Sequence, residues 1–211
     1  MSLQTFGLSP VRATRAVGSY WNGADLAEVA QRVLEEVLDQ GCLLPYTKIT
    51  GRPVFPVVQW LTHSLSRRSS SGVGPLTRLS NLGEVLEDPA RSVSIPAPLR
   101  ILAFISVSRL SSAGQDLAGL RTVSRTIVAC PGTAIPSPLV AAEYDYRGTT
   151  IAACDENAVR VLVEGDPGVR PGSALDPFWL RYRQEQMFSL AIKGGYWPTS
   201  EGWPAFHQAP R

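Results

Sequence analysis

The clearest pattern in the chain is a helical alternation of apolar and polar residues between residues 24 and 40. Apolar side chains recur there every three to four residues, at Leu26, Ala30, Val33 and Val37. This spacing predicts an amphipathic helix over Ala24–Gln40. Asn22 is the expected N-cap, because its side-chain oxygen accepts hydrogen bonds from first-turn amides, and Gly41 is the expected left-handed stop.

Later segments are rich in β-branched and aromatic residues. The run Leu99–Ser108 predicts a buried strand. Shorter runs predict further strands at Thr122–Ala129, Leu139–Tyr146 and Thr149–Ala153. The turn Arg147-Gly148 is expected to join the last two as a hairpin, and a helix is expected over Asp176–Ile192. Helices on a mainly antiparallel sheet make this an α+β fold.

Proline and glycine divide the chain after residue 163. The run Gly165–Gly172 is typical of a linker. We therefore expect one domain over residues 1–163, and a linker, a short helix and an aromatic strap over residues 164–211. The strap contains Tyr196, Trp197, Trp203 and Phe206. It is expected to cover the core, with a partner surface as the alternative.

Composition narrows the classes of function. Twenty basic and eighteen acidic residues leave a net charge of +2, which is too small to favour nucleic acid. Cys42, Cys130 and Cys154 are widely spaced, so free thiols in a reducing compartment are expected. Neither a signal peptide nor a membrane-spanning stretch is evident. These features predict a cytoplasmic protein without membrane contact.

Motifs of catalysis are absent from the sequence. His63 and His207 stand outside any HExxH arrangement, and the chain has no GxSxG turn or phosphate-binding glycine loop. No metal site is expected, and no residue is assigned a catalytic role. Asp145 and Asp155 flank the predicted hairpin beside Cys154, so an unrecognised site at these three residues stays open as one hypothesis.

Two stretches, taken in order, carry a resemblance to a known family. The first runs from Leu8 to Trp21 and continues into the helix Leu26–Leu38. The second, Leu79–Val85, reads Leu-Ser-Asn-Leu-Gly-Glu-Val. With the strand near Phe104 and the hairpin, residues 8–163 resemble the C-terminal half of the superfamily of chloramphenicol acetyltransferases, condensation domains and alcohol O-acetyltransferases.

The resemblance implies a function and a set of contacts. The second stretch is similar to the strand start that lines the family's substrate tunnel, where Ser80 and Asn81 would supply polar contacts and Gly83 close backbone approach. The donor would be acyl-CoA or an acyl-carrier thioester, and no bound cofactor is implied. The family's HHxxxDG and DFGWG-type motifs are absent, so the base that deprotonates the acceptor is missing.

Two functions therefore follow from the sequence. The first is an acyltransferase-like half-domain, truncated or completed by another chain, that acylates a small-molecule hydroxyl or amine in a biosynthetic pathway and is inactive in isolation. Its exposed apolar face predicts a homodimer or a complementary N-terminal half. The alternative is a non-catalytic binding or scaffold protein.

Overall fold

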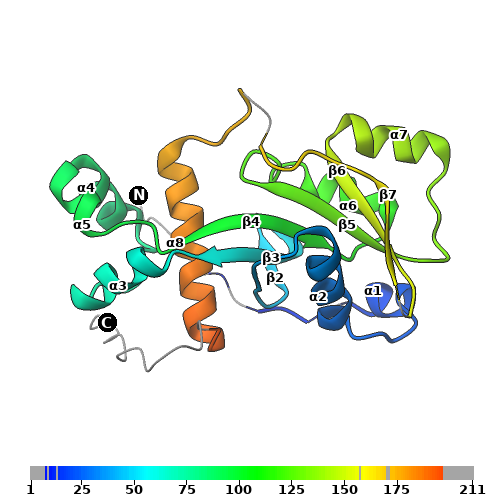
Figure 1. Ribbon diagram of the computed structural model, residues 1–211, viewed down its shortest axis with the longest axis horizontal. Helices are drawn as coiled ribbons and strands as arrows, with labels where there is room; N and C mark the ends of the chain where they lie inside the picture. Colours follow the sequence, from blue (N-terminus) through cyan, green and yellow to red (C-terminus); the bar gives the residue numbers. More distant parts are fainter. Residues whose placement is uncertain (1–7, 9, 13, 157, 170–171, 197–211) are drawn as a thin grey trace. The chain divides into compact units, whose positions relative to one another are not determined.

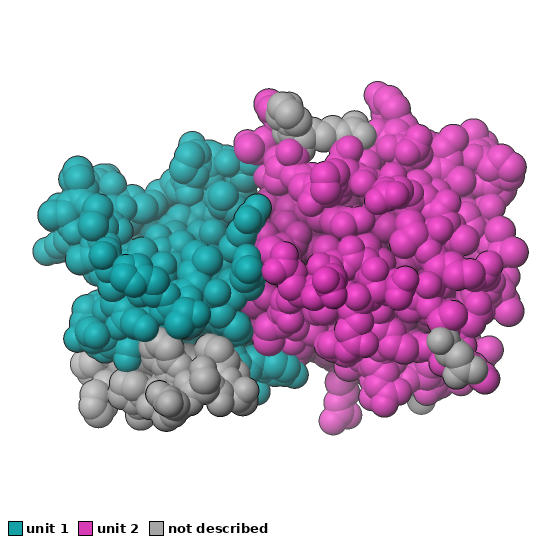
Figure 2. All heavy atoms as spheres, viewed as in Figure 1, with its two compact units in different colours: residues 1–9, 59–100, 175–211 teal, residues 10–58, 101–174 magenta. Residues whose placement is uncertain are grey.

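The computed structural model describes residues 8, 10–12, 14–156, 158–169 and 172–196. The chain divides into two compact units (Figure 2). Residues 10–58 and 101–174 form the sheet unit, and residues 1–9, 59–100 and 175–211 form the helical unit. The fold is α+β, as predicted. The predicted boundary at residue 163 stays a prediction.

One sheet runs through the fold in the order β1-β3-β4-β5-β6-β7, with β2 also paired to β3 (Figure 1). The strands are β1 (Cys42–Leu43), β2 (Thr47–Ile49), β3 (Arg52–Trp60), β4 (Leu99–Ser106), β5 (Arg125–Pro131), β6 (Thr149–Cys154) and β7 (Val159–Val163). The predicted strands at residues 99–108, 122–129 and 149–153 are thus confirmed, with shifted ends.

The sheet is mixed, so the expectation of a mainly antiparallel sheet was wrong. β1 and β2 are antiparallel to β3, and β7 is antiparallel to β6, but β4, β5 and β6 are parallel. Parallel neighbours need a crossover connection, usually a helix. Here α6 (Leu110–Leu117) links β4 to β5, and α7 (Pro138–Tyr146) links β5 to β6.

The predicted hairpin was also wrong, because a crossover helix takes the place of its first strand. Residues 138–146 form α7, not a strand, so the turn at Arg147-Gly148 joins a helix to β6. Ser137 accepts a hydrogen bond from the amide of Val140, and Pro138 occupies the first turn, where its missing N–H costs nothing. Gly148 adopts φ 66°, the left-handed conformation that ends many helices.

The predicted N-terminal helix is confirmed as α2 (Leu26–Val37), but both of its ends differ from expectation. Asp25, not Asn22, is the N-cap, and its carboxylate accepts from the amide of Ala27. The left-handed residue after the helix is Asp39, with φ 58°, two residues before the predicted stop at Gly41. Short polar side chains tolerate this conformation, so glycine is not required there.

The core of the sheet unit lies between α2 and the central strands. Val29, Ala30 and Val33 of α2 pack with alternate residues of β4, β5 and β6. Trp21, which follows α1 (Arg15–Tyr20), joins this cluster and donates from Nε1 to the carbonyl of Val107 at 2.8 Å. Every residue of β6 is buried, as in strands covered on both faces.

The helical unit contains α3 (Thr62–Ser70), α4 (Leu79–Glu87), α5 (Pro89–Ser94) and α8 (Pro177–Gly194). The last of these confirms the helix expected near Asp176–Ile192. The carboxylate of Glu185 is buried between two guanidinium groups, those of Arg68 at 2.5 Å and Arg181 at 3.0 Å. It also accepts from the amide of Leu76 at 2.9 Å. This buried ionic triad connects α3, α8 and the loop before α4.

Candidate functional site

The carboxyl ends of β4, β5 and β6 are where open parallel sheets usually bind substrates. In this chain Trp21 packs at that end and hydrogen-bonds just beyond β4. Burial raises the pKa of Cys130 to about 11 and that of Cys154 to about 12. Burial also raises the pKa of Tyr20 and Tyr144 to about 12. Both thiols therefore stay protonated near neutral pH and are weak nucleophiles.

At the same end of the sheet, Asp155 makes contacts that hold the backbone in place. Its carboxylate lies where a side chain at Gly132 would begin, and it pairs with Arg160 at 3.4 Å. Arg32 donates to the carbonyls of Asp155 and Glu156 at 2.6 and 2.9 Å. These contacts hold the turn between β6 and β7 against α2.

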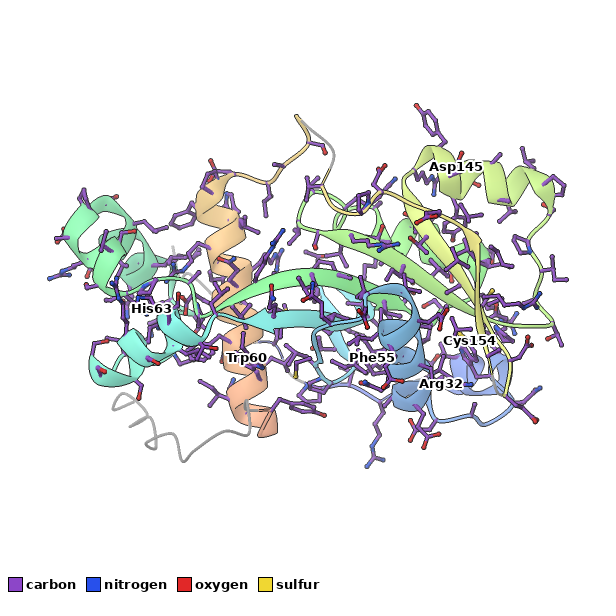
Figure 3. The ribbon with its side chains drawn as sticks, viewed as in Figure 1. Arg32, Phe55, Trp60, His63, Asp145 and Cys154 are labelled. Carbon is purple, nitrogen blue, oxygen red and sulfur yellow. The ribbon has the colours of Figure 1, made fainter. Side chains whose placement is uncertain are left out.

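The hypothesis of a site at Asp145, Asp155 and Cys154 is not supported by their positions. Asp145 is exposed on α7, before β6 begins, whereas Cys154 is the last residue of β6 (Figure 3). Asp155 directly follows Cys154. A six-residue strand separates them by roughly 16 Å. The hairpin on which the hypothesis rested is a helix followed by a strand, and so the two carboxylates do not approach one another.

A cavity of about 220 Å³ lies at the opposite, amino ends of β5 and β6. Three segments of the sheet unit form it: the connection from α6 to β5, the turn from α7 to β6, and the chain after β7. Its lining residues are Ala118, Arg121, Thr122, Ser124, Thr126, Arg147, Gly148, Asp166, Gly168 and Ser173. The lining includes Arg121, Arg147 and Asp166, and Arg147 is also paired with the carboxylate of Glu143 on α7. Four of the lining residues carry hydroxyl groups.

Hydrogen bonds fix the walls of this cavity. Arg121 donates from a guanidinium nitrogen to the carbonyl of Arg147 at 3.1 Å, which ties the first segment to the second. The amide of Asp166 donates to the carbonyl of Gly148 at 3.0 Å, which ties the third segment to the second. The hydroxyl of Ser124 donates to backbone carbonyls of β4, so its oxygen can accept a hydrogen bond from the cavity.

Gly165 allows the close approach of the third segment. A Cβ atom there would lie 2.4 Å from the amide nitrogen of Thr150 and 2.6 Å from the carbonyl oxygen of Gly148. Both are backbone atoms of the β6 start and cannot rotate away. The cavity wall therefore requires glycine at this position.

The variant Gly165→Ala is expected to lose about 1–3 kcal/mol of stability, because the added methyl group overpacks against fixed backbone. Denaturant unfolding would measure the loss. Gly168→Ala in the same segment is the control, since its Cβ would meet no atom within 4 Å. Equal stability of the two variants would show that the tight packing of Gly165 has no energetic role.

The residues predicted to bind substrate lie elsewhere. Ser80, Asn81 and Gly83 belong to α4, so the strand start expected there was wrong. Ser80 and Asn81 are exposed, and their side chains are 3.3 Å apart at Ser80 Oγ and Asn81 Oδ1. The buried residues of this helix are Leu82 and Val85, one turn apart. The spacing of Leu82 and Val85 in the sequence is typical of a helix and not of a strand, so it could have predicted α4.

His63 lies on α3 (Figure 3). It lines an open groove between α3 and α5 with a volume of about 630 Å³. The groove is lined by His63, Ser66, Arg67, Ser70, Ser71, Ala90, Val93 and Ser94. Its serine hydroxyls donate to backbone carbonyls of their own helices, including Ser66 to Thr62 and Ser70 to Ser66. This is ordinary local bonding of helical serines. His207 lies outside the described residues, as does the strap beyond Tyr196.

The cysteines and the acidic side chains of the described residues form no further site. Cys42, Cys130 and Cys154 are free thiols, as predicted. Within the described ranges, no three His, Cys, Asp or Glu side chains are grouped to hold a metal ion. A helix with the length and apolarity to cross a bilayer is likewise not found among these residues.

The sequence matches no protein-family model. A search of curated proteins gives no match either, and no solved structure matches the fold.

Proposed function

We propose that this chain is a non-catalytic binding protein for a small anionic ligand, held in the cavity at the amino ends of β5 and β6. The position of the cavity carries the proposal. Enzymes with parallel α/β architecture place catalytic groups at the carboxyl ends of the strands. Here the cavity is at the other end, and the thiols at the carboxyl end have raised pKa values.

The lining chemistry indicates the kind of ligand. Arginine binds carboxylate and phosphate groups through paired N–H donors, and Arg121 is held in place by its hydrogen bond to Arg147. The Ser124 hydroxyl donates to the backbone of β4, so its oxygen lone pair would accept from a hydroxyl or amine elsewhere on the ligand. The volume is below the roughly 300–1,000 Å³ of drug-sized sites. A small carboxylate or phosphate with a hydrogen-bond donor fits best.

The test is thermal unfolding and calorimetry with inorganic phosphate, small hydroxycarboxylates and small sugar phosphates as probes. A ligand at about 100 times its Kd adds about 2.7 kcal/mol, which raises Tm by roughly 5–10 °C for a chain of this size. Stabilisation by the phosphate probes alone would indicate a phosphate site, and stabilisation by the carboxylates alone would indicate a carboxylate site. No response from any probe at millimolar concentration would contradict the proposal.

The variant Arg121→Gln is expected to weaken binding of the responding probe by about 10–150-fold, since a hydrogen bond to a charged group contributes about 1.5–3 kcal/mol. Arg160→Gln is the matched control, because Arg160 lies on β7 and is absent from the cavity lining. Calorimetry would measure both Kd values. Equal losses in the two variants would mean that the anion binds through general surface charge.

Acyl transfer stays a prediction of the sequence. Two elements that supported the resemblance, the strand start near Ser80 and the first strand of the hairpin, are helices. A panel of acyl-CoA donors with small alcohols separates the two functions. The binding proposal expects no release of free CoA, whereas turnover in Arg121→Gln and the parent alike would establish catalysis at another site.

A further inference from the structure

Three buried hydroxyl groups lie at the amino ends of β5 and β6, in and beside the cavity. Ser124 and Thr126 line the cavity and are 7% and 1% exposed. Thr149 is opposite Thr126 in the strand register and is 2% exposed, but it does not line the cavity. Buried polar groups need hydrogen-bond partners. The partners of these three hydroxyls therefore indicate which ligand groups the cavity can bind.

Ser124 can accept a hydrogen bond from a ligand but has no proton to give it. A hydroxyl group has one proton, and that of Ser124 is directed at the carbonyls of Ile101 and Leu102, at 3.0 and 2.5 Å. The oxygen keeps lone pairs for a donor. Ser124 therefore suits a ligand hydroxyl or amine, and does not suit a carboxylate oxygen, which has no proton.

Thr126 has the opposite role. The hydroxyl oxygens of Thr126 and Thr149 are 2.9 Å apart, a distance that fits donation in either direction. The pair has two protons and this hydrogen bond uses one of them. Among the described residues, neither hydroxyl has another partner. A second proton on Thr149 would be buried without an acceptor, which is costly, whereas one on Thr126 can reach the cavity. Thr149 is therefore the donor to Thr126, and Thr126 the donor to the cavity.

The charges of the lining favour a carboxylate over a phosphate. Arg147 is paired with Glu143, and Asp166 adds a carboxylate to the lining. A phosphate monoester carries roughly 1.5 to 2 negative charges near neutral pH, whereas a carboxylate carries one. Arg121 and the Thr126 hydroxyl provide donors for one anionic group. A single negative charge is therefore the closer match.

We propose that the ligand of this cavity is a small α-hydroxycarboxylate, with Thr126 donating to its carboxylate and Ser124 accepting from its hydroxyl. The inference rests on the proposed function and narrows it. Only the strand residue Arg125 separates Ser124 from Thr126, so their Cα atoms are roughly 7 Å apart. Hydrogen bonds of about 2.8 Å at each end leave roughly 2–4 Å between the two ligand groups. A carboxylate oxygen and a hydroxyl on the adjacent carbon have this separation.

Calorimetry of the parent chain tests the ligand class, with lactate, its isomer with a terminal hydroxyl, propionate, alanine and inorganic phosphate as probes. Lactate should bind about 3–10-fold more tightly than propionate, because its hydroxyl gives the buried Ser124 oxygen a donor. It should also bind more tightly than its isomer. Equal Kd values for lactate and either of these probes would overturn the inference. Tighter binding of alanine would overturn it as well, since Asp166 would then bind an ammonium group.

Two variants assign the contacts to their residues. Thr126→Val removes the donor to the carboxylate, so it should weaken lactate and propionate alike by about 10-fold or more. Ser124→Ala should remove the advantage of lactate over propionate. Ser106→Ala is the matched control, because Ser106 is a buried serine on β4 that does not line the cavity. It should keep the advantage. A Ser124→Ala variant that also keeps it would overturn the assignment.

Failure of this inference is distinguishable from failure of the proposed function. If no probe binds, phosphate included, the anion site itself is contradicted. If phosphate alone binds, or if lactate and propionate bind equally, the anion site stands and the α-hydroxycarboxylate is overturned. The comparison of lactate with propionate needs only the parent chain, so it decides the matter even where a variant does not fold.

Discussion

Glu185→Ala is expected to destabilise the protein by about 3–5 kcal/mol. Glu185 and Arg68 are fully buried, and Arg181 is nearly so. Removing the carboxylate leaves two guanidinium groups in a dry interior, together with the amide of Leu76 that it accepted from. Such a loss is a large part of the roughly 5–15 kcal/mol that holds a domain folded. Guanidinium-induced unfolding, followed by tryptophan fluorescence, measures it.

Two companion variants make this prediction specific. Glu143→Ala breaks an exposed ion pair with Arg147, and should cost only about 0–1 kcal/mol. The triple change Arg68→Met, Arg181→Met and Glu185→Leu removes all three charges, and should be less destabilising than Glu185→Ala alone. If the triple variant were the least stable, the hydrogen bonds of the triad to backbone would be its main contribution.

Trp21→Ala, in the sheet unit, is expected to lower the free energy of unfolding by about 3–5 kcal/mol. Trp21 is 6% exposed, and its ring packs in the core beneath α2. Its Nε1 also satisfies the carbonyl of Val107, just beyond β4. The substitution therefore opens a cavity and leaves a buried acceptor without its donor. Equilibrium denaturation followed by circular dichroism gives the free energy of unfolding.

Trp21→Phe separates packing from hydrogen bonding. It keeps most of the apolar volume but removes the indole N–H, so a loss of about 1–3 kcal/mol is expected. Trp179→Ala removes an equally large ring that is 46% exposed, and should cost less than Trp21→Ala. If Trp21→Phe and Trp21→Ala were equally unstable, the hydrogen bond would account for the whole effect.

The helices and strands whose positions were predicted correctly share a strong local signal. In α2 the apolar spacing is helical, and four of its apolar residues are buried as that spacing implies. The run at Leu99–Ser106 is β-branched and aromatic, and it forms the central strand β4. α8 begins at Asp176-Pro177, an N-cap followed by proline, and ends before Gly195. Local chemistry suffices for such elements.

α7 shows where local chemistry is ambiguous. Its sequence, Pro-Leu-Val-Ala-Ala-Glu-Tyr-Asp-Tyr, carries apolar residues on two faces, so neither a helical nor an alternating period stands out. Ser137 and Pro138 are a helix-start signal, whereas Val140, Tyr144 and Tyr146 favour a strand. Tertiary packing decides the outcome, because a parallel β5–β6 pair requires a crossover and α7 supplies it.

The sequence by itself determined the α+β class, the places of α2, β4 and α8, and the absence of a recognisable catalytic motif. Only the tertiary structure decided the strand directions and the cavity. Arg121, Gly148 and Gly165 are far apart in the chain and meet because β5 and β6 run parallel, with Thr126 opposite Thr149. Each residue alone resembles an ordinary loop residue. Strand register depends on contacts between distant segments, so no local pattern encodes their meeting.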